Sequence, residues 1–241
     1  MLFLCFISFY KQTVLGPLWY LIQPLFTSIT FTIIFNNLAG INTGTVPPFL
    51  FNLAGITVWN YFTACLTGTS NTFGANAGIF GKVYFPRIIV PISIVISNLL
   101  KFGIQFGIFI AFYLFYYFQG AAISLNGLVV FFPILIIVMG ILGLGLGMFI
   151  SSLVTKYRDF SYLIGFGVQL LMYVSAVVYP MALVKDKMPE YVWLVQYNPL
   201  AYIIETTRYM LLNVGHISFW GLGYTFVATV VIFLVGVLIF N

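Results

Sequence analysis

The longest uncharged stretch of this chain is the feature that most constrains its fold. Residues 12–81 contain no Lys, Arg, Asp or Glu, and all 241 residues together hold only 9 Lys plus Arg and 4 Asp plus Glu. The charged fraction is 5% and the hydrophobic fraction is 62%, whereas about a quarter of the residues in a typical soluble domain are charged. This composition suits a lipid bilayer, so we predict an integral membrane protein with one domain over residues 1–241.

Six segments are apolar over a length that can cross a bilayer as a helix, which takes roughly 20 residues. They are residues 18–35, 49–70, 88–118, 127–153, 160–179 and 217–240. Their continuous apolarity favours helices over barrel strands, in which apolar and polar residues alternate. The third segment is about 46 Å long at ~1.5 Å per residue, so it must tilt, bend or protrude. We therefore predict an all-α integral membrane fold with six transmembrane helices.

The positions of Lys and Arg predict the orientation, because positively charged loops remain on the cytoplasmic side. With the N-terminus inside, the inner segments hold Lys11, Lys82, Arg87, Lys156 and Arg158 against one acid, Asp159. The outer loops at 36–48 and 119–126 are uncharged, and the three cations of residues 184–216 are balanced by three acids. This bias predicts that both termini lie in the cytosol.

Composition and motifs argue against several functional classes. The net charge of +5 comes from dispersed cations without a basic stripe, which speaks against nucleic-acid binding. Gly81 and Lys82 are followed by Val83 instead of the Ser or Thr of a phosphate-binding loop, so no ATP site is expected. A single histidine, His216, cannot form a metal cluster. We expect no metal, no cofactor and no catalytic residue in this chain.

Small residues recur along the fourth predicted span. Gly143, Gly147 and Ser151 are spaced four residues apart and form a ridge that lets another helix approach closely. Gly143 to Gly147 read GLGLG, but the spacing differs from a dinucleotide-binding fingerprint and the site is inside a span. Two partners remain open for this ridge, a helix of the same bundle and a second copy of the chain.

Three segments outside the apolar centres of the spans carry motifs. They read YKQTVLGPLWY at 10–20, GIFGKVYFPR at 78–87 and NPLAYIIETTR at 198–208. With six spans in the same order, these segments resemble the permease subunits of type-2 ABC transporters that export polysaccharides such as O-antigen, teichoic acid or capsule chains. The chain departs from the family pattern before Tyr10, where the usual basic lead-in is uncharged, and after Asn241, where a polar tail is absent.

The resemblance implies an exporter in the bacterial cytoplasmic membrane that moves a polyprenyl-diphosphate-linked glycan outward. It implies a second copy of the chain and two cytosolic ABC ATPase subunits as partners, with ATP hydrolysis confined to those subunits. An exporter of the same type for a drug or a small lipid is the alternative. A membrane-embedded enzyme would need carboxylates or histidines in the bundle, and a secondary transporter would show repeated halves with buried carboxylates; the sequence shows neither.

The first cytoplasmic loop is the expected contact with the ATPase. It contains Lys82, Val83, Tyr84, Phe85, Pro86 and Arg87. Pro86 must begin or end a helix, so the segment forms a compact amphipathic turn. Taken singly, Lys82 and Arg87 fit topology anchors and Tyr84 fits the aromatic belt. Taken as a unit, the segment is predicted to be a coupling helix.

The last outer segment, residues 179–215, is too apolar for a free loop. Asn198 as a cap and Pro199 in the first turn predict a helix start. Glu205 and Arg208 stand three residues apart on that helix and can pair; a surface salt bridge of little worth is the alternative. We predict a re-entrant helical segment between the fifth and sixth spans, and the resemblance implies that it narrows the outer mouth.

Two spans carry polar and aromatic faces. These faces comprise Trp19, Gln23, Thr27 and Thr30 on the first span, and Lys101, Phe102, Phe106, Phe109, Tyr113 and Tyr116 on the third, where Asn98 and Gln105 share the face of Lys101. Most such stripes serve helix packing or an interfacial girdle. The functional interpretation is a conduit whose rings contact the C–H faces of sugars. In it Lys101 meets a lipid diphosphate, unless it snorkels to the interface.

Overall fold

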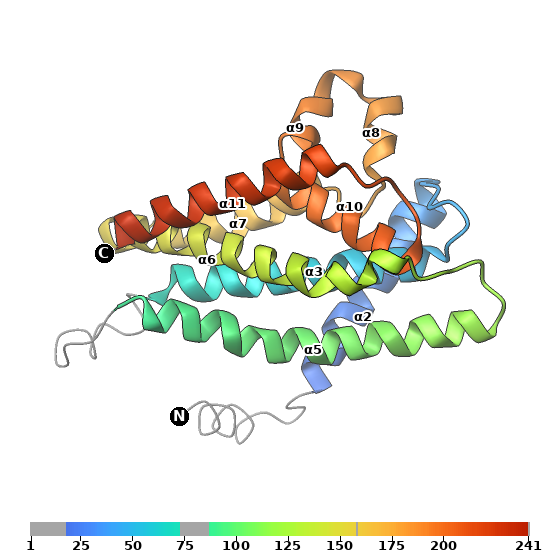
Figure 1. Cartoon of the computed structure of the whole chain (residues 1–241), viewed down its shortest axis with the longest axis horizontal. Helices are drawn as coiled ribbons and strands as arrows, with labels where there is room; N and C mark the ends of the chain where they lie inside the picture. Colours follow the sequence, from blue (N-terminus) through green and yellow to red (C-terminus); the bar gives the residue numbers. More distant parts are fainter. Residues whose placement is uncertain (1–17, 73–86, 158, 241) are drawn as a thin grey trace.

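The computed structural model describes residues 18–72, 87–157 and 159–240, and every regular element among them is helical. The elements are α2 (Trp19–Phe31), the π-helix η2 (Thr32–Leu38), α3 (Pro48–Ser70), α5 (Ile89–Phe118), the 3-10 helix η3 (Gly127–Phe131), α6 (Phe132–Lys156), α7 (Phe160–Val174), α8 (Met181–Lys187), the 3-10 helix η4 (Pro189–Tyr191), α9 (Val192–Gln196), α10 (Pro199–Leu212) and α11 (Phe219–Phe240). The long helices run alongside one another, α2 crosses them obliquely, and α8 and α9 stand off the bundle (Figure 1).

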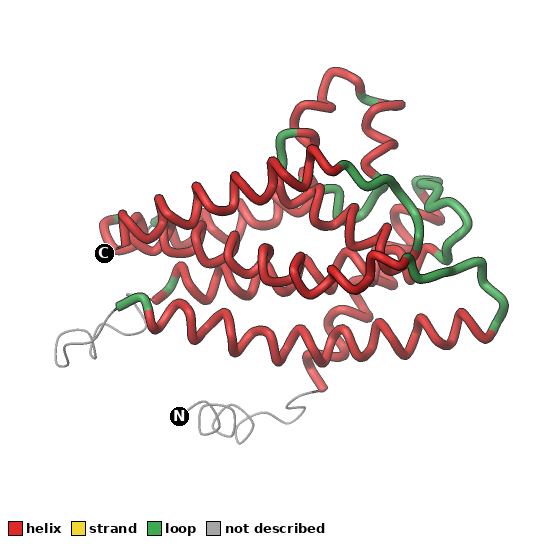
Figure 2. The backbone as a smooth tube through the Cα atoms, viewed as in Figure 1, coloured by secondary structure: helices red, strands yellow, loops and turns green. Residues whose placement is uncertain are grey.

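Five helical segments are long and apolar enough to cross a membrane. They are Trp19–Leu38, Pro48–Ser70, Ile89–Phe118, Gly127–Lys156 and Phe219–Phe240. Because α5 has 30 residues, it is about 45 Å long, which exceeds the ~30 Å hydrocarbon core. The chain is thus a multi-pass membrane protein whose described residues form only helical elements, and loops and turns gather at the two ends of the bundle (Figure 2).

The predicted helix at residues 160–179 is wrong over its last five residues, which are not helical. α7 ends at Val174 after 15 residues, and Ala176 has the left-handed φ of 53°. The carbonyl groups that follow accept hydrogen bonds from a side chain of α10 instead of continuing a helical ladder. As a helix alone, α7 is therefore shorter than a span.

The helix α3 forms the centre of the bundle, and most of its side chains are buried. The small-residue ridge of α6 packs on it: a Cβ on Gly147 would lie 2.6 Å from the Thr69 Cβ, and one on Gly143 would lie 3.0 Å from the Cys65 Cβ. Gly145 faces the opposite way, onto the backbone of α11 at Phe233. The ridge is confirmed as a close helix contact, and its partner is a helix of the same chain.

The π-helix η2 is fastened to α3 by a buried amide. The side chain of Asn52 is fully buried and donates to Thr32 Oγ1 at 3.1 Å and to Asn36 Oδ1 at 2.9 Å. Asn36 in turn donates to the carbonyl oxygen of Ile41 at 2.8 Å. Single π-helical turns within α-helices often occur at functional sites. Here the hydrogen bonds from Asn52 fix how α2 is rotated against α3.

Candidate functional site

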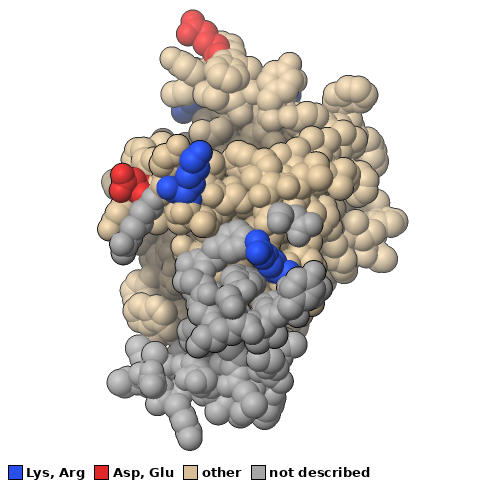
Figure 3. All heavy atoms as spheres, turned by 90° about the vertical axis from the view of Figure 1, so that its left-hand side faces the viewer, with Lys and Arg blue, Asp and Glu red and all other residues tan. Residues whose placement is uncertain are grey.

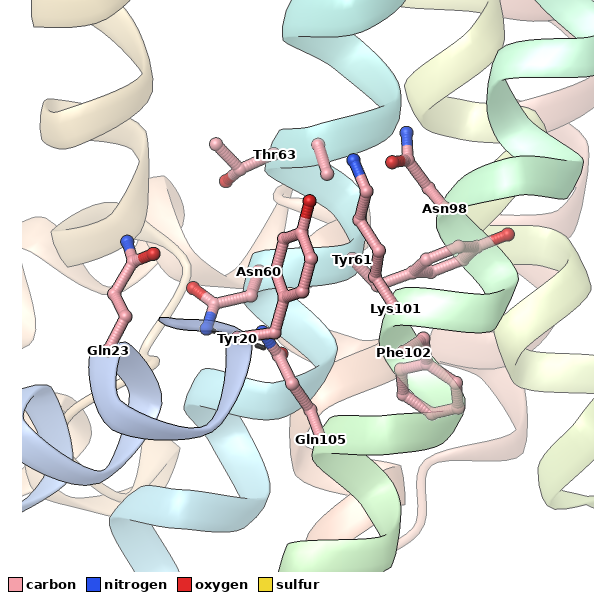
Figure 4. Close-up of a pocket in the computed structure, with 10 residues that line it drawn as sticks. Tyr20, Gln23, Asn60, Tyr61, Thr63, Asn98, Lys101, Phe102 and Gln105 are labelled. Carbon is pink, nitrogen blue, oxygen red and sulfur yellow. Dashed lines mark hydrogen bonds between the residues drawn. The ribbon is translucent and has the colours of Figure 1, made fainter. Parts of the chain in front are cut away.

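A polar cavity of about 200 Å³ lies between α2, α3 and α5 (Figure 4). Its lining residues are Tyr20, Gln23, Asn60, Tyr61, Thr63, Ala64, Asn98, Lys101, Phe102 and Gln105. Eight of these ten carry a polar group, in a chain that is 62% hydrophobic. The cavity therefore gathers hydrogen-bonding groups within an apolar bundle, and convergent polar groups in a pocket are what fix the orientation of a ligand.

Helical spacing brings these side chains together. On α5, Asn98, Lys101 and Gln105 are separated by three and four residues, so they share one face. On α3, Asn60 and Thr63 are three residues apart, and α2 adds polar groups with the same spacing. Each of the three helices thus turns a narrow polar edge toward a common centre.

Lys101 supplies the charge of the cavity. Its Nζ lies 5.5 Å from the centroid of the Tyr20 ring, within range of a cation–π contact. Asn98 and Gln105 beside it are buried, and Asn60 Nδ2 donates to Gln105 Oε1 at 3.4 Å (Figure 4). None of the four acidic residues of the sequence lines the cavity. The site therefore presents a positive charge and amide groups without a carboxylate.

Of the ten residues predicted to line a conduit, the cavity gathers three, Gln23, Lys101 and Phe102. Trp19 is 56% exposed on the outer side of α2. Thr27 donates to the Gln23 carbonyl oxygen at 2.9 Å, and Thr30 is exposed. The first-span face is therefore split between the cavity and the outer surface of the chain.

The aromatic stripe of α5 packs largely within the bundle. Phe106 stacks on Phe102 and Phe109 with centroid distances of 5.7 and 5.8 Å, and it lies 5.0 Å from Phe132 of α6. Phe109 and Tyr113 are buried as well. These contacts match the packing interpretation of the stripe. Contact of Phe102, Phe106, Phe109, Tyr113 and Tyr116 with a glycan stays a prediction.

Sequence reasoning missed the contribution of α3 to this site. Asn60 and Thr63 lie in the predicted second span but were not chosen as site residues, although two polar side chains three residues apart in a span are a usable signal. Thr63 Oγ1 is buried and has no hydrogen-bond partner among the described residues. A buried polar atom without a partner often marks a place where a ligand or water binds.

A second buried cation lies at the outer end of the predicted topology, on α10. Arg208 is fully buried, and its Nη1 donates to the carbonyl oxygens of Ala176 at 2.9 Å and Tyr179 at 3.3 Å. Its Nη2 donates to the carbonyl oxygen of Val177. The guanidinium carbon stands 3.8 Å from the centroid of the Phe51 ring. Arg208 therefore fixes the turn that follows α7 against α3 and α10.

Glu205 completes this cluster. Its Oε2 lies 3.9 Å from Arg208 Nη1, so the predicted pair is confirmed, but the surface alternative is wrong because both side chains are buried. Burial raises the pKa of the Glu205 carboxyl, while the Arg208 charge opposes that shift. The predicted helix start is also confirmed, since Asn198 Oδ1 accepts from the Leu200 N–H at 3.0 Å and Pro199 opens α10.

The predicted coupling segment lies mostly outside the described residues, which omit Lys82, Val83, Tyr84, Phe85 and Pro86. Arg87 is described, and it is exposed in the turn before α5. Figure 3 faces this end of the molecule and shows few charged atoms among the described residues. A coupling role for Lys82 to Arg87 stays a prediction.

Comparison with known proteins places the chain in a family. Residues 2–212 match the family described as ABC-2 type transporter. The chain is 28% identical over 233 residues to a protein named O-antigen export system permease protein RfbA from Klebsiella pneumoniae, which covers 96% of this chain and 86% of the relative. A Myxococcus xanthus protein of the same name is 22% identical over 178 residues, with coverage of 74% and 66%. Because the family match spans residues 2–212, the chain belongs to the ABC-2 type transporter family of membrane proteins.

Proposed function

We propose that this chain is the transmembrane subunit of an ATP-driven ABC exporter that moves a polyprenyl-diphosphate-linked polysaccharide across the bacterial cytoplasmic membrane. The observation that carries the proposal is the similarity over 96% of the chain to a protein named as an O-antigen export permease. The cargo is an O-antigen-like or cell-wall glycan. All 241 residues act as one transmembrane domain with both termini in the cytosol.

The proposed topology has six crossings. α7 contributes about 22 Å at 1.5 Å per residue, and the turn at residues 175–179 that follows it is held by the side chain of Arg208. In this proposal the fifth crossing comprises α7 together with that turn, because α7 alone is shorter than the ~30 Å hydrocarbon core. The short helices α8, α9 and α10 then form the re-entrant outer segment, in which Asn198, Pro199, Glu205 and Arg208 shape the outer gate.

The proposed mechanism needs a second copy of the chain and two cytosolic ATPase subunits. The permease has no phosphate-binding loop in its sequence, so nucleotide binding in the partners supplies the free energy that favours one packing of the two permease copies over another. Residues 82–87 transmit this change as a coupling helix. The glycan then passes the polar and aromatic faces of α2 and α5 that were predicted to form the conduit.

Deletion of the gene in its own organism tests the proposal. The deletion strain is expected to lose surface polysaccharide and to accumulate polyprenyl-linked glycan on the cytoplasmic side, measured by surface labelling and by lipid extraction. Expression of the full chain from a plasmid restores export. Unchanged surface polysaccharide in the deletion strain, with loss of resistance to a drug instead, would support the small-molecule alternative.

The coupling segment is tested by alanine replacement of residues 82–87. The variant is expected to reach the membrane at wild-type levels but to lose co-purification with the ATPase subunit, and export with it. Alanine replacement of Lys185 and Lys187, exposed cations on α8, serves as the matched control. Intact assembly and export in the 82–87 variant contradict the coupling role.

A further inference from the structure

We infer that the cavity between α2, α3 and α5 is a binding site for the phosphate ester group of a lipid, held by Lys101 and the surrounding amides. Two lipids carry such a group: the export substrate, in its diphosphate, and a bulk anionic phospholipid, in its headgroup. The inference deepens the proposed function and rests on it for the first of these two sources. The chemistry recognised is the same in both cases.

The first support is the charge of the site. An ionisable side chain within a span is unfavourable unless it has a partner of opposite charge or faces a polar cavity. Lys101 is twelve residues into α5, about 18 Å from its start at 1.5 Å per residue, so it lies inside the hydrophobic segment. No carboxylate lines the cavity. An anion that enters the cavity supplies the missing countercharge.

The second support is the supply of hydrogen-bond donors. Amide side chains from three helices, Gln23, Asn60, Asn98 and Gln105, and the hydroxyl groups of Tyr61 and Thr63 line the same space. Phosphate oxygens accept several hydrogen bonds at once, and those from charged or amide donors are the strongest. Thr63 Oγ1 is buried without a partner among the described residues, so a donor remains available on the α3 side.

The third support indicates that the phosphate is attached to a lipid. Gln23 lines the cavity and is also exposed. Trp19 and Phe26, four residues before and three after it, are 56% and 66% exposed, so all three share one face of α2. A headgroup in the cavity therefore leaves room for its hydrocarbon chain along an apolar helix face that meets the membrane.

Lipid titration of the full-length chain in detergent, read by native mass spectrometry, tests the inference. The probes are a polyprenyl diphosphate, the polyprenol of the same chain length and phosphatidylglycerol. Wild-type protein is expected to bind the polyprenyl diphosphate at least about tenfold more tightly than the polyprenol, since hydrogen bonds to charged groups contribute on this scale. Lys101→Gln is expected to remove that preference.

Lys156→Gln is the matched control. Lys156 also faces a tyrosine ring, with its Nζ 5.4 Å from the Tyr157 centroid, but it is exposed at the end of α6. This variant is expected to bind every probe as the wild type does. Lys101→Arg keeps the charge and is expected to retain the preference for the diphosphate over the polyprenol, because arginine also binds phosphate. If Lys101→Gln fails to fold, Gln105→Leu and Asn60→Leu test the same cavity with smaller losses.

The relative affinities of the three lipids decide whether the site exists and which lipid fills it. Equal Lys101-dependent binding of phosphatidylglycerol and polyprenyl diphosphate supports the site and identifies bulk phospholipid as a source; a preference for the diphosphate supports the site and identifies the export substrate. Equal binding of polyprenol and diphosphate, or wild-type binding by Lys101→Gln, overturns the inference. In that case glycan export by the wild-type chain still stands, because the deletion strain tests it separately.

Discussion

Among the described residues, Arg208 and Lys101 are cations that lie within the bundle, and their surroundings differ. Arg208 is fully buried and donates to three carbonyl oxygens, stacks on Phe51 and lies beside Glu205. Lys101 is half-buried, contacts the face of Tyr20 and borders a cavity without an acid. One charge has its partners within the chain, whereas the other faces space that a ligand can occupy.

The difference separates a structural role from a binding role. A guanidinium has five donors in a fixed plane, so it can join several carbonyl groups in one arrangement. An ammonium is a compact charge on a flexible stem, and it binds phosphate as a point charge without a fixed geometry. We therefore expect substitutions around Arg208 to change stability, and substitutions of Lys101 to change binding and export while stability is retained.

Replacement of Arg208 is expected to have the largest effect. Arg208→Met leaves the carbonyl groups after α7 and the Glu205 carboxyl without their partner, and the removal of one member of a buried charged pair costs about 3–5 kcal/mol. The free energy of unfolding, measured by denaturant titration in detergent, should fall by this amount. Lys187→Met, at an exposed site on α8, should change it by less than about 0.5 kcal/mol. A small loss in Arg208→Met would remove the contrast between the two cations.

Gly55 allows the close approach of α3 to this cluster. A Cβ there would lie 2.6 Å from Arg208 Nη2 and 2.8 Å from the Val177 carbonyl oxygen. Gly55→Ala is therefore expected to lower the free energy of unfolding by about 1–3 kcal/mol through overpacking. Gly107→Ala is the control, because no atom lies within 4 Å of the added Cβ and alanine favours a helix. Equal stability of the two variants would contradict the tight fit.

Glu205 gives the Arg208 cluster a pH dependence. Because burial raises its pKa above the ordinary 4.5, the folded state holds this proton more tightly than the unfolded state does. The contribution of Glu205 to stability is complete below pH 4.5 and is lost as the pH rises through the raised value. Glu205→Gln should remove this decline in unfolding temperature as the pH rises above 4.5. A decline of wild-type size in the variant would assign it to other groups.

The smallest effect on stability is expected at Lys101. Lys101→Met replaces a half-buried cation with an apolar side chain of similar length, and because no acidic residue lines the cavity, the change leaves no partner charge uncompensated. The free energy of unfolding should change by less than about 1 kcal/mol, whereas polysaccharide export should fall to the level of the deletion strain. Retained export in a well-folded Lys101→Met protein would show that Lys101, like Arg208, has no binding role.

Span positions followed from the sequence because they depend on local composition. The helix boundaries of α3, α5 and α11 lie within two residues of the predicted segments, since length and apolarity alone decide which residues enter a bilayer. The start of α10 was equally local, because Asn198 and Pro199 are a cap and a first-turn residue.

The end of α7 and the full set of residues around the cavity could not be predicted from local composition. Residues 175–179 contain no glycine or proline that would end a helix, but three of their carbonyl groups accept hydrogen bonds from Arg208, which lies about thirty residues further along the chain. The cavity likewise depends on how three helices rotate against one another. The polar residues of α5 were predicted to share a face, and the spacing of Asn60 and Thr63 in the second span was a signal as well, but only the packed structure shows that these two polar faces lie opposite each other.

The π-helical segment Thr32–Leu38 carries a consequence for sequence insertions and deletions. Its wider turn accommodates an additional residue, so loss of one residue there would let α2 continue as an ordinary helix. The part of α2 before the deletion would then rotate by about 100° relative to Asn36, and Tyr20 and Gln23 would turn away from the cavity. A homologue that is one residue shorter at this point is expected to offer a different ligand environment, even with every cavity side chain identical.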